Sequence, residues 1–195
     1  MKLLWCDIET TGLQPDKDLI LEVCVREATL EAPFTSKPLY HAVFAVYTTT
    51  ERGYERLTEK TALPKMAENG LGVSQLVIDM HTKNGLWQAC SESLKLVEDA
   101  DRALSGLVPE EADKDLRPIL AGSTIHFDKS FLRVWMPQFH ARLSHRLYDV
   151  SAIKLFCQSL GMPKIPKGEA HRAEADVLES IDHAERCVNW LASEW

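Results

Sequence analysis

The order of the apolar segments is the feature that most limits the fold of this chain. Three strand-like runs follow one another at 3–8, 19–26 and 40–48, separated by turn-forming and polar residues. After them, segments with helical spacing alternate with two short apolar strands at 118–121 and 147–150. This order predicts an α/β fold in which one mixed five-stranded sheet is flanked by helices.

The helices that this fold requires are indicated by apolar residues at helical spacing. A segment of mixed character in the first half is expected to be helical only in part. The expected helices are 87–104, 129–136, a helix from Ser151, 174–191 and part of 51–72. One such sheet uses the whole chain, so we expect residues 1–195 to form a single domain.

The cysteines and the first residues favour a cytoplasmic protein. The five cysteines are an odd number and form no Cys-x-x-Cys pair, so we expect neither a disulfide framework nor structural zinc. Residues 1–7 hold one basic residue and reach a carboxylate at Asp7, which does not fit a signal peptide. No apolar run is long enough to cross a bilayer, so we expect no membrane partner.

The net charge of −7 restricts the nucleic acids that such a chain could bind. Proteins that hold long nucleic acids usually carry a basic stripe, because binding is driven by neutralisation of phosphates. The sequence shows no such stripe. A nucleic-acid enzyme with this charge would depend on metal ions and a small phosphate site, which favours a short substrate.

Asp7 and Glu9 form the first candidate site. They are two residues apart on an expected strand, so their side chains point to the same face, at the carboxyl end where open sheets bind ligands. Two adjacent carboxylates repel each other unless a cation lies between them. The natural partner is a hard divalent ion such as Mg²⁺ or Mn²⁺.

Three further residues add to this pair. Asp128 follows the buried strand at 118–121, where a lone aspartate is more often a helix cap. His171 comes five residues before Asp176 near the start of the last expected helix. If His171 lies where that helix begins, both side chains can reach one cleft. A histidine ordinarily titrates near pH ~6.5, so it can accept a proton at neutral pH.

The order of these groups resembles the DEDDh branch of 3′-to-5′ exonucleases. Residues 7–13 match the first motif of that branch, residues 122–132 the second and residues 171–176 the third. Members share a ribonuclease H-like fold, in which four carboxylates hold two divalent metal ions and a histidine is the general base. The resemblance therefore implies a ribonuclease H-like sheet and two-metal phosphodiester hydrolysis.

Carried over residue by residue, the resemblance gives each of the five residues a role. Asp7 is expected to bridge both ions, while Glu9 and Asp176 serve the ion that binds the attacking water. Asp128 is expected to act through water on the second ion. His171 is expected to remove the proton of the attacking water. The implied cofactors are two divalent ions, Mg²⁺ or Mn²⁺.

Within this branch the chain is most similar to the oligoribonucleases. The similarity is carried by residues 122–151, especially 131–132, 136–139 and 146–151. Residues 81–86, His-Thr-Lys-Asn-Gly-Leu, resemble the His-x-x-Ser-Gly-Leu segment of that family. Oligoribonucleases are homodimers that degrade very short RNAs from the 3′ end. The resemblance therefore implies a homodimer that binds short single-stranded RNA.

The same resemblance implies residues that bind the substrate. A leucine at the place of Leu13 wedges between bases, and residues matching His81, Thr124, Arg146 and Ser151 form a pocket that caps the 5′ phosphate. Binding by one arginine and neutral donors suits a negatively charged chain. The implied substrate-binding residues are Leu13, His81, Thr124, His145, Arg146 and Ser151.

Some positions depart from the family pattern. Leu76 stands where the family has a tryptophan, and His145 stands where a tyrosine reaches across the dimer. Both family residues stack on bases, which is worth about 1–3 kcal/mol per base. Leu76 cannot stack, and His145 stacks less well. Residues 30–70 also match the family poorly, so we expect a weaker preference for dinucleotides.

Two other interpretations stay open. A DNA-directed exonuclease of the proofreading or repair type would have the same metal motifs, because these bind phosphate rather than sugar. A catalytically inactive nucleic-acid-binding relative is a non-enzyme alternative. The intact acidic residues and His171 argue against it, since an inactive protein has no chemical need for all of them. A purely structural protein is the least specific interpretation.

Overall fold

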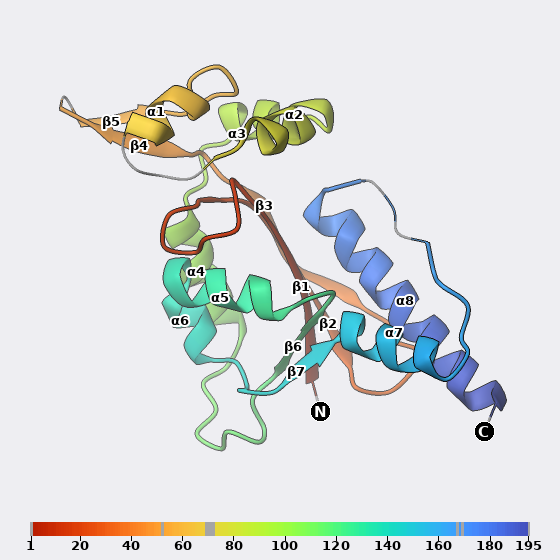
Figure 1. The fold of residues 1–195 in the computed structure, drawn as a ribbon. Helices are drawn as coiled ribbons and strands as arrows, with labels where there is room; N and C mark the ends of the chain where they lie inside the picture. The colour runs from red at the N-terminus through yellow and green to blue at the C-terminus, as the bar shows by residue number, and fades with distance from the viewer. Residues whose placement is uncertain (1, 52, 69–72, 167, 169, 195) are drawn as a thin grey trace.

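The five strands of the main sheet are β1 (Lys2–Thr10), β2 (Ile20–Thr29), β3 (Lys37–Val43), β6 (Ile119–Gly122) and β7 (Leu147–Asp149). They stand in the order β3-β2-β1-β6-β7 (Figure 1). β1 pairs antiparallel with β2 and parallel with β6. The expected mixed five-stranded sheet is confirmed. The computed structural model describes residues 2–51, 53–68, 73–166, 168 and 170–194.

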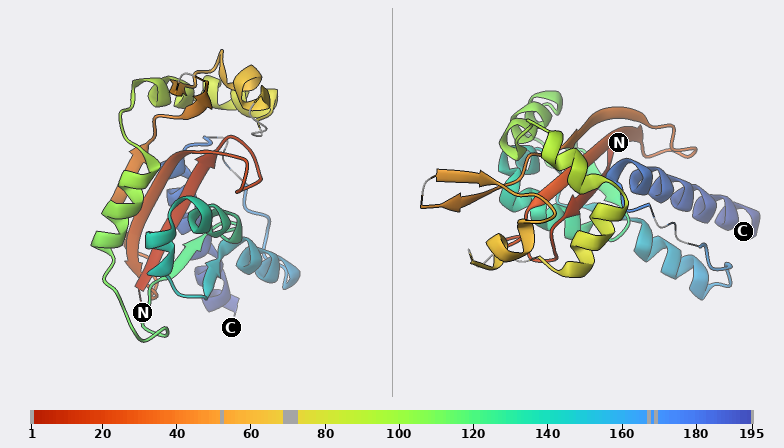
Figure 2. Two further views of the ribbon diagram at one scale, coloured as in Figure 1. Left: turned by 90° about the vertical axis from the view of Figure 1, so that its left-hand side faces the viewer. Right: turned by 90° about the horizontal axis from the view of Figure 1, so that it is seen from above.

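Helices cover both faces of this sheet, as two further views show (Figure 2). Helices α4, α5 and α6 pack on one face, and helices α7 and α8 pack on the other. Their bounds are α4 (Val97–Leu107), α5 (His126–Trp135), α6 (Pro137–Ala141), α7 (Val150–Ser159) and α8 (Ala173–Glu194).

The side chains of β1 alternate between these two cores. Leu4 and Ile8 pack with α4, α5 and α6, whereas Trp5 packs with α8. Because successive side chains of a strand point to opposite faces, Asp7 and Glu9 continue the set that contains Trp5. Both carboxylates therefore lie on the α8 side of the sheet, near the carboxyl end of β1.

The segment expected as one helix at 87–104 is two helices, so that prediction was wrong. Helix α3 spans Leu86–Glu92, and α4 begins only after a break. Ser93 has an extended backbone, and the N–H of Ala45 donates a hydrogen bond of 2.8 Å to the carbonyl of Lys95. These tertiary bonds interrupt the helix, although the apolar spacing of the sequence continues across the break.

The third expected strand, at 40–48, is also divided, and the prediction of one strand was wrong. β3 ends at Val43, and β4 (Tyr47–Thr50) pairs with β5 (Gly53–Arg56) in a separate hairpin. Residues 44–46 between β3 and β4 are buried. Their burial explains the continuous apolar run, which does not distinguish a strand in the sheet from a buried connection.

The mixed segment at 51–72 contains one short helix, α1 (Ala62–Glu68), as expected in part. Residues 52 and 69–72 of that segment lie outside the described residues. Helix α2 (Gln75–Lys83), which we did not predict, lies with α1 and α3 beyond the carboxyl end of β1 (Figure 1). The other expected elements are present with ends shifted by a few residues.

All five cysteines are free and buried, and the sequence pattern had predicted no disulfide framework. The five are Cys6, Cys24, Cys90, Cys157 and Cys187. Among the helices that the structure describes, none combines the length and apolar character needed to span a membrane.

Candidate active site

Three carboxylates gather where β1 approaches the first turn of α8. Asp7 and Glu9 lie on β1, and Asp176 lies in the first turn of α8. One oxygen atom from each carboxylate can be chosen so that all three atoms lie within 4.8 Å of one another. A set of oxygen ligands at this spacing suits a hard divalent cation.

The electrostatics of Glu9 also fit a cation at this place. Burial, together with the charges of Asp176, Glu22 and Asp128, raises the pKa of Glu9 from 4.5 to about 8. Without a cation, this carboxyl group would therefore hold a proton at neutral pH. A divalent ion among the oxygens would reverse this effect, because it favours the ionised form.

Asp128 approaches the same carboxylates from the first turn of α5. Its side chain is buried, and Oδ1 accepts a hydrogen bond of 3.0 Å from the N–H of Ile8, which lies between Asp7 and Glu9. Burial raises the pKa of Asp128 from 3.8 to about 8, and bonds from backbone N–H groups oppose that rise. Asp128 is thus a fourth acidic group held beside the same strand.

One cleft of about 330 Å³ brings all five predicted catalytic residues together. We call it the active-site cleft. Its wall also contains Leu13, which the sequence predicted, and His126 and Phe127, which it did not. The lining residues are Asp7, Ile8, Glu9, Leu13, Ser123, Thr124, His126, Phe127, Asp128, His171 and Asp176.

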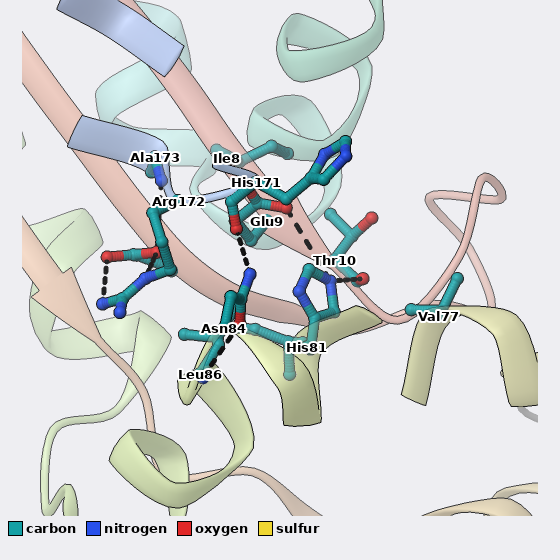
Figure 3. Close-up of polar contacts among 12 residues, drawn as sticks. Ile8, Glu9, Thr10, Val77, His81, Asn84, Leu86, His171, Arg172 and Ala173 are labelled. Carbon is teal, nitrogen blue, oxygen red and sulfur yellow. Dashed lines mark hydrogen bonds and ion pairs between the residues drawn. The ribbon is translucent and has the colours of Figure 1, made fainter. Parts of the chain in front are cut away.

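His171 enters this cleft from the segment just before α8, in an unusual conformation. Its φ is 46°, in the left-handed region that side chains with a β-carbon rarely adopt. The amide nitrogen of Asn84 donates a hydrogen bond to the carbonyl of His171. Figure 3 shows this carbonyl facing Asn84, while the imidazole ring extends away from it.

The residue after His171 is fixed by a buried carboxylate that sequence reasoning missed. Nε and Nη2 of Arg172 donate hydrogen bonds of 2.9 and 3.0 Å to the two oxygens of Glu22, and the N–H of Ala173 adds a third. Burial alone would raise the pKa of Glu22, but the bonds from His41, Arg172 and Ala173 outweigh it and lower the pKa to about 2. The available sequence signal was an acidic residue between the apolar runs at 19–21 and 23–25.

His81 is buried against β1, the strand that carries Asp7 and Glu9. Nε2 of His81 lies 3.2 Å from the carbonyl oxygen of Thr10 and 3.7 Å from Oε2 of Glu9 (Figure 3). Within the described residues, Nδ1 of His81 has no hydrogen-bond partner. Burial lowers the pKa of His81, although the bond to Thr10 opposes this. The expected phosphate-binding histidine thus lies beside a candidate metal ligand.

Two other predicted substrate-binding residues meet in a neighbouring pocket. Oγ1 of Thr124 and Oγ of Ser151 lie 3.0 Å apart. Oδ1 of Asp149 accepts hydrogen bonds of 3.1 Å from the N–H of Thr124 and 2.9 Å from the N–H of Ser151. Both hydroxyls line a cavity of about 300 Å³ that also reaches Asp7 and Asp176. We call this cavity the hydroxyl pocket.

Lys154 is a cationic residue of the hydroxyl pocket that the sequence analysis missed. It also lines the pocket, and its Nζ lies 3.1 Å from Nδ1 of the buried His183. The sequence signal for Lys154 was its position three residues after Ser151, because residues three apart on a helix share a face. Beside the acidic residues Asp7, Asp176 and Glu179, the pocket therefore offers hydroxyl donors and the ammonium group of Lys154.

The remaining predicted substrate-binding residues lie apart from this pocket. Leu13 is 80% exposed at the wall of the active-site cleft. Nη2 of Arg146 forms an ion pair of 2.9 Å with Oδ1 of Asp115, and His145 is exposed. Neither Arg146 nor His145 lines the cleft or the hydroxyl pocket in the single chain.

The fold is shared with solved exonuclease structures. The structure of E. coli exonuclease I in complex with a dT13 oligonucleotide matches with a TM-score of 0.56 and 16% identity, over 95% of this chain. A structure of exonuclease I without ligand gives a TM-score of 0.55 and 14% identity. The chain spans 40% of the first structure and 44% of the second. The likeness establishes the ribonuclease H-like fold.

Curated sequences give a closer likeness, although no model of a known protein family matches the chain. The oligoribonuclease of Corynebacterium diphtheriae is 31% identical over 201 residues, which cover 99% of this chain and 85% of that protein. A probable oligoribonuclease of Schizosaccharomyces pombe is 31% identical, covering 97% and 69%. A mitochondrial oligoribonuclease of Bos taurus is 30% identical, covering 92% and 69%. With this identity along almost its whole length, the chain belongs to the oligoribonuclease family.

Proposed function

We propose that the chain is a metal-dependent 3′-to-5′ exoribonuclease that hydrolyses short RNA strands to nucleoside 5′-monophosphates. The observation that carries this proposal is the active-site cleft, which joins four acidic residues and His171 from distant parts of the sequence. Family membership adds the substrate class, because the relatives are named oligoribonucleases. A catalytically inactive relative would not require this set of side chains.

The proposed cofactors are two divalent ions, Mg²⁺ or Mn²⁺, held by the acidic residues of the cleft. Asp7 would ligate both ions, Glu9 and Asp176 would complete one site, and Asp128 would act on the other through water. When bound, such ions lower the pKa of a water molecule and neutralise charge on the leaving oxygen. The oxygen-only ligand set and the raised pKa of Glu9 support this assignment.

His171 is the proposed general base. It lines the same cleft as the acidic residues and is held in place by contacts of its backbone. Its imidazole would take the proton of the attacking water as the bond to the 3′-terminal nucleotide breaks. The departing strand then carries a free 3′ hydroxyl, and the product is a nucleoside 5′-monophosphate.

The substrate would extend from the cleft toward the hydroxyl pocket. Leu13, at the cleft wall, would contact a base, and Thr124 with Ser151 would bind a phosphate at the other end of a short strand. Lys154 is the cation of this pocket. His81, Arg146 and His145 remain proposed substrate-binding residues, the last across a homodimer interface. We also propose a cytoplasmic location and a single domain.

Metal-supported hydrolysis of RNA and DNA series tests this function. Strands labelled at the 5′ end, from the dinucleotide upward, are incubated with Mn²⁺ and then with a chelator. We expect stepwise shortening of RNA, with short strands degraded fastest, and no products after chelation. Equal or faster degradation of DNA would support the DNA-directed alternative. An absence of products with both polymers would support the inactive relative. Asp176→Asn serves as the control for contaminating nucleases.

A further inference from the structure

The backbone of His171 has a left-handed conformation that contacts with neighbouring residues must stabilise. Among the described residues, two non-glycine residues have positive φ, Thr124 at 56° and His171 at 46°. Both line the active-site cleft. Left-handed backbone is unfavourable for side chains with a β-carbon and persists only where the surroundings impose it. The contacts around His171 therefore determine where its imidazole lies.

Asn84 makes contacts with both peptide groups that flank His171. Its amide nitrogen donates a hydrogen bond to the carbonyl of His171 and lies 3.4 Å from the carbonyl oxygen of Ala170. Its other side-chain atom, Oδ1, accepts a hydrogen bond of 3.0 Å from the N–H of Leu86. One side chain thus connects the turn between α2 and α3 to the segment that carries His171, as Figure 3 shows.

We propose that Asn84 is a positioning residue that holds the imidazole of His171 in the active-site cleft. The inference rests on the proposed role of His171 as general base. Because Asn84 contacts the carbonyls on both sides of His171, it restrains the backbone dihedral angles of that residue. These angles set the direction of its Cα–Cβ bond. Without the amide donor, the segment relaxes toward ordinary φ values and the ring leaves its place in the cleft.

The turn that carries Asn84 is firmly anchored. Leu86 is buried in the core cluster that contains Ile78 and Trp87. His81, three residues before Asn84 on the same face of α2, contacts Thr10 and Glu9 at the end of β1. The end of α2 therefore contacts both the strand of the metal ligands and the segment of the base, so it fixes one relative to the other.

The second support of this segment is independent of Asn84. The guanidinium of Arg172 and the N–H of Ala173 bind Glu22, which lies on β2. This support keeps the start of α8, and with it Asp176, in place when Asn84 is changed. A substitution of Asn84 should therefore displace His171 while the carboxylates of the metal site stay together.

Asn84→Asp separates this role from that of Asn84 at the start of α3. The aspartate has nearly the same shape and can still accept from the N–H of Leu86, but it cannot donate to the carbonyl of His171. Lys83→Gln is the matched control, because it makes the same change in net charge at the neighbouring exposed position. Asn84→Ala removes the donor without adding a charge, in case the aspartate variant does not fold.

We expect Asn84→Asp to lower kcat about 10- to 100-fold with KM within about two-fold, because displacing a catalytic group by about 1 Å costs up to about 10²-fold. His171→Ala should lower kcat by about 10²–10⁴-fold. In the His171→Ala background, Asn84→Asp should have almost no further effect, since residues that act as a unit are not additive. Lys83→Gln should match wild type.

Two measurements without turnover complete the test. The ring C–H resonance of His171 in the metal-free protein should shift in Asn84→Asp and not in Lys83→Gln, while calorimetric Mn²⁺ binding stays as in wild type. An additive loss in the double variant, or an unchanged His171 resonance, would overturn the role of Asn84. Wild-type activity of His171→Ala would instead overturn the base assignment, so the two failures are distinguishable.

Discussion

The backbone N–H of Ile8 donates a hydrogen bond of 3.0 Å to Oδ1 of Asp128, although 120 residues separate the two. Ile8 lies between Asp7 and Glu9 on β1, so this bond sets Asp128 of α5 beside the other carboxylates. A donor from the strand that carries Asp7 and Glu9 thus positions the fourth acidic residue of the cleft.

Substitution of Asp128 separates its charge from this hydrogen bond. Asp128→Asn keeps an acceptor for Ile8, so we expect the metal-free variant to melt close to the wild-type temperature at neutral pH, because Asp128, with a pKa of about 8, is largely neutral there as well. Hydrolysis should fall by more than about 10²-fold. Asp128→Ala leaves the N–H of Ile8 unpaired, at a cost of about 1–3 kcal/mol. Equal melting temperatures for the two variants would contradict the role of this bond.

Removing a carboxylate from the proposed metal site should abolish hydrolysis without harming the fold. In Asp7→Ala or Asp176→Ala, the metal-free protein should melt at or above the wild-type temperature, because neighbouring carboxylates repel one another. Thermal unfolding in the presence of a chelator and rates with Mn²⁺ provide the two measurements. A variant that retains activity within about ten-fold of wild type would exclude the two-metal assignment.

The pH dependence of stability should reveal the raised pKa values of the cleft. Glu9 and Asp128 have folded-state pKa values of about 8 against ordinary values of 4.5 and 3.8. Their contribution is fully present below pH ~4 and is lost as pH rises through about 8. The metal-free protein should therefore melt at progressively lower temperature from pH 5 to pH 9, and Mn²⁺ should reverse the loss.

The control for this titration is Glu9→Gln. Its melting temperature should depend less on pH over the same range, because the amide does not ionise. Glu22, with a pKa of about 2, contributes a constant stability above pH ~4.5 and does not interfere. A wild-type melting temperature that stays flat or rises with pH in the absence of metal would contradict the assignment.

Much of the fold and the cleft follows from local sequence patterns. Alternation of side chains between the two faces of β1 placed Asp7 and Glu9 on one face, and Asp128 follows the apolar strand at 118–121. These predictions need only the alternation of side chains along one strand and the rule that ligands bind at the carboxyl ends of the strands in an open sheet. The structure brings these three residues into one cleft with Asp176.

The rest depends on contacts between distant segments. The hydrogen bond from the N–H of Ala45 to the carbonyl of Lys95 fixes the break between α3 and α4. The spacing of apolar residues does not predict this bond. Glu22 is buried because Arg172, 150 residues later, binds it. Likewise, His81 reaches the end of β1 because α2 folds over it. Such partners have no signal in local spacing or composition.

The 5′ phosphate of the substrate tests the hydroxyl pocket. If Lys154 binds that phosphate, Lys154→Gln should raise KM about ten-fold for a 5′-phosphorylated dinucleotide, since a bond to a charged group is worth about 1.5–3 kcal/mol. The unphosphorylated dinucleotide should be unaffected, and the pentanucleotide only slightly, because its end extends beyond the pocket. Lys164→Gln is the control, because it makes the same change in net charge at an exposed position that does not line the pocket. Arg146→Gln tests the family expectation in the same assay.

The results of that assay identify the cation. A selective loss in Lys154→Gln alone assigns the phosphate to the pocket of Thr124 and Ser151. A selective loss in Arg146→Gln alone would mean that Arg146 leaves Asp115 on binding or acts in a homodimer, and would exclude Lys154. Equal losses for phosphorylated and unphosphorylated strands would show that the residue supports the fold.

The most direct test of the account is a time course on a pentaribonucleotide labelled at its 5′ end, with Mn²⁺ as the metal. The account predicts a ladder of labelled strands that shorten one nucleotide at a time, with unlabelled nucleoside 5′-monophosphates released and no reaction in the presence of a chelator. A 3′-terminal phosphate should slow the first step. Immediate release of a labelled mononucleotide, or internal cleavage, or full activity without metal, would contradict it.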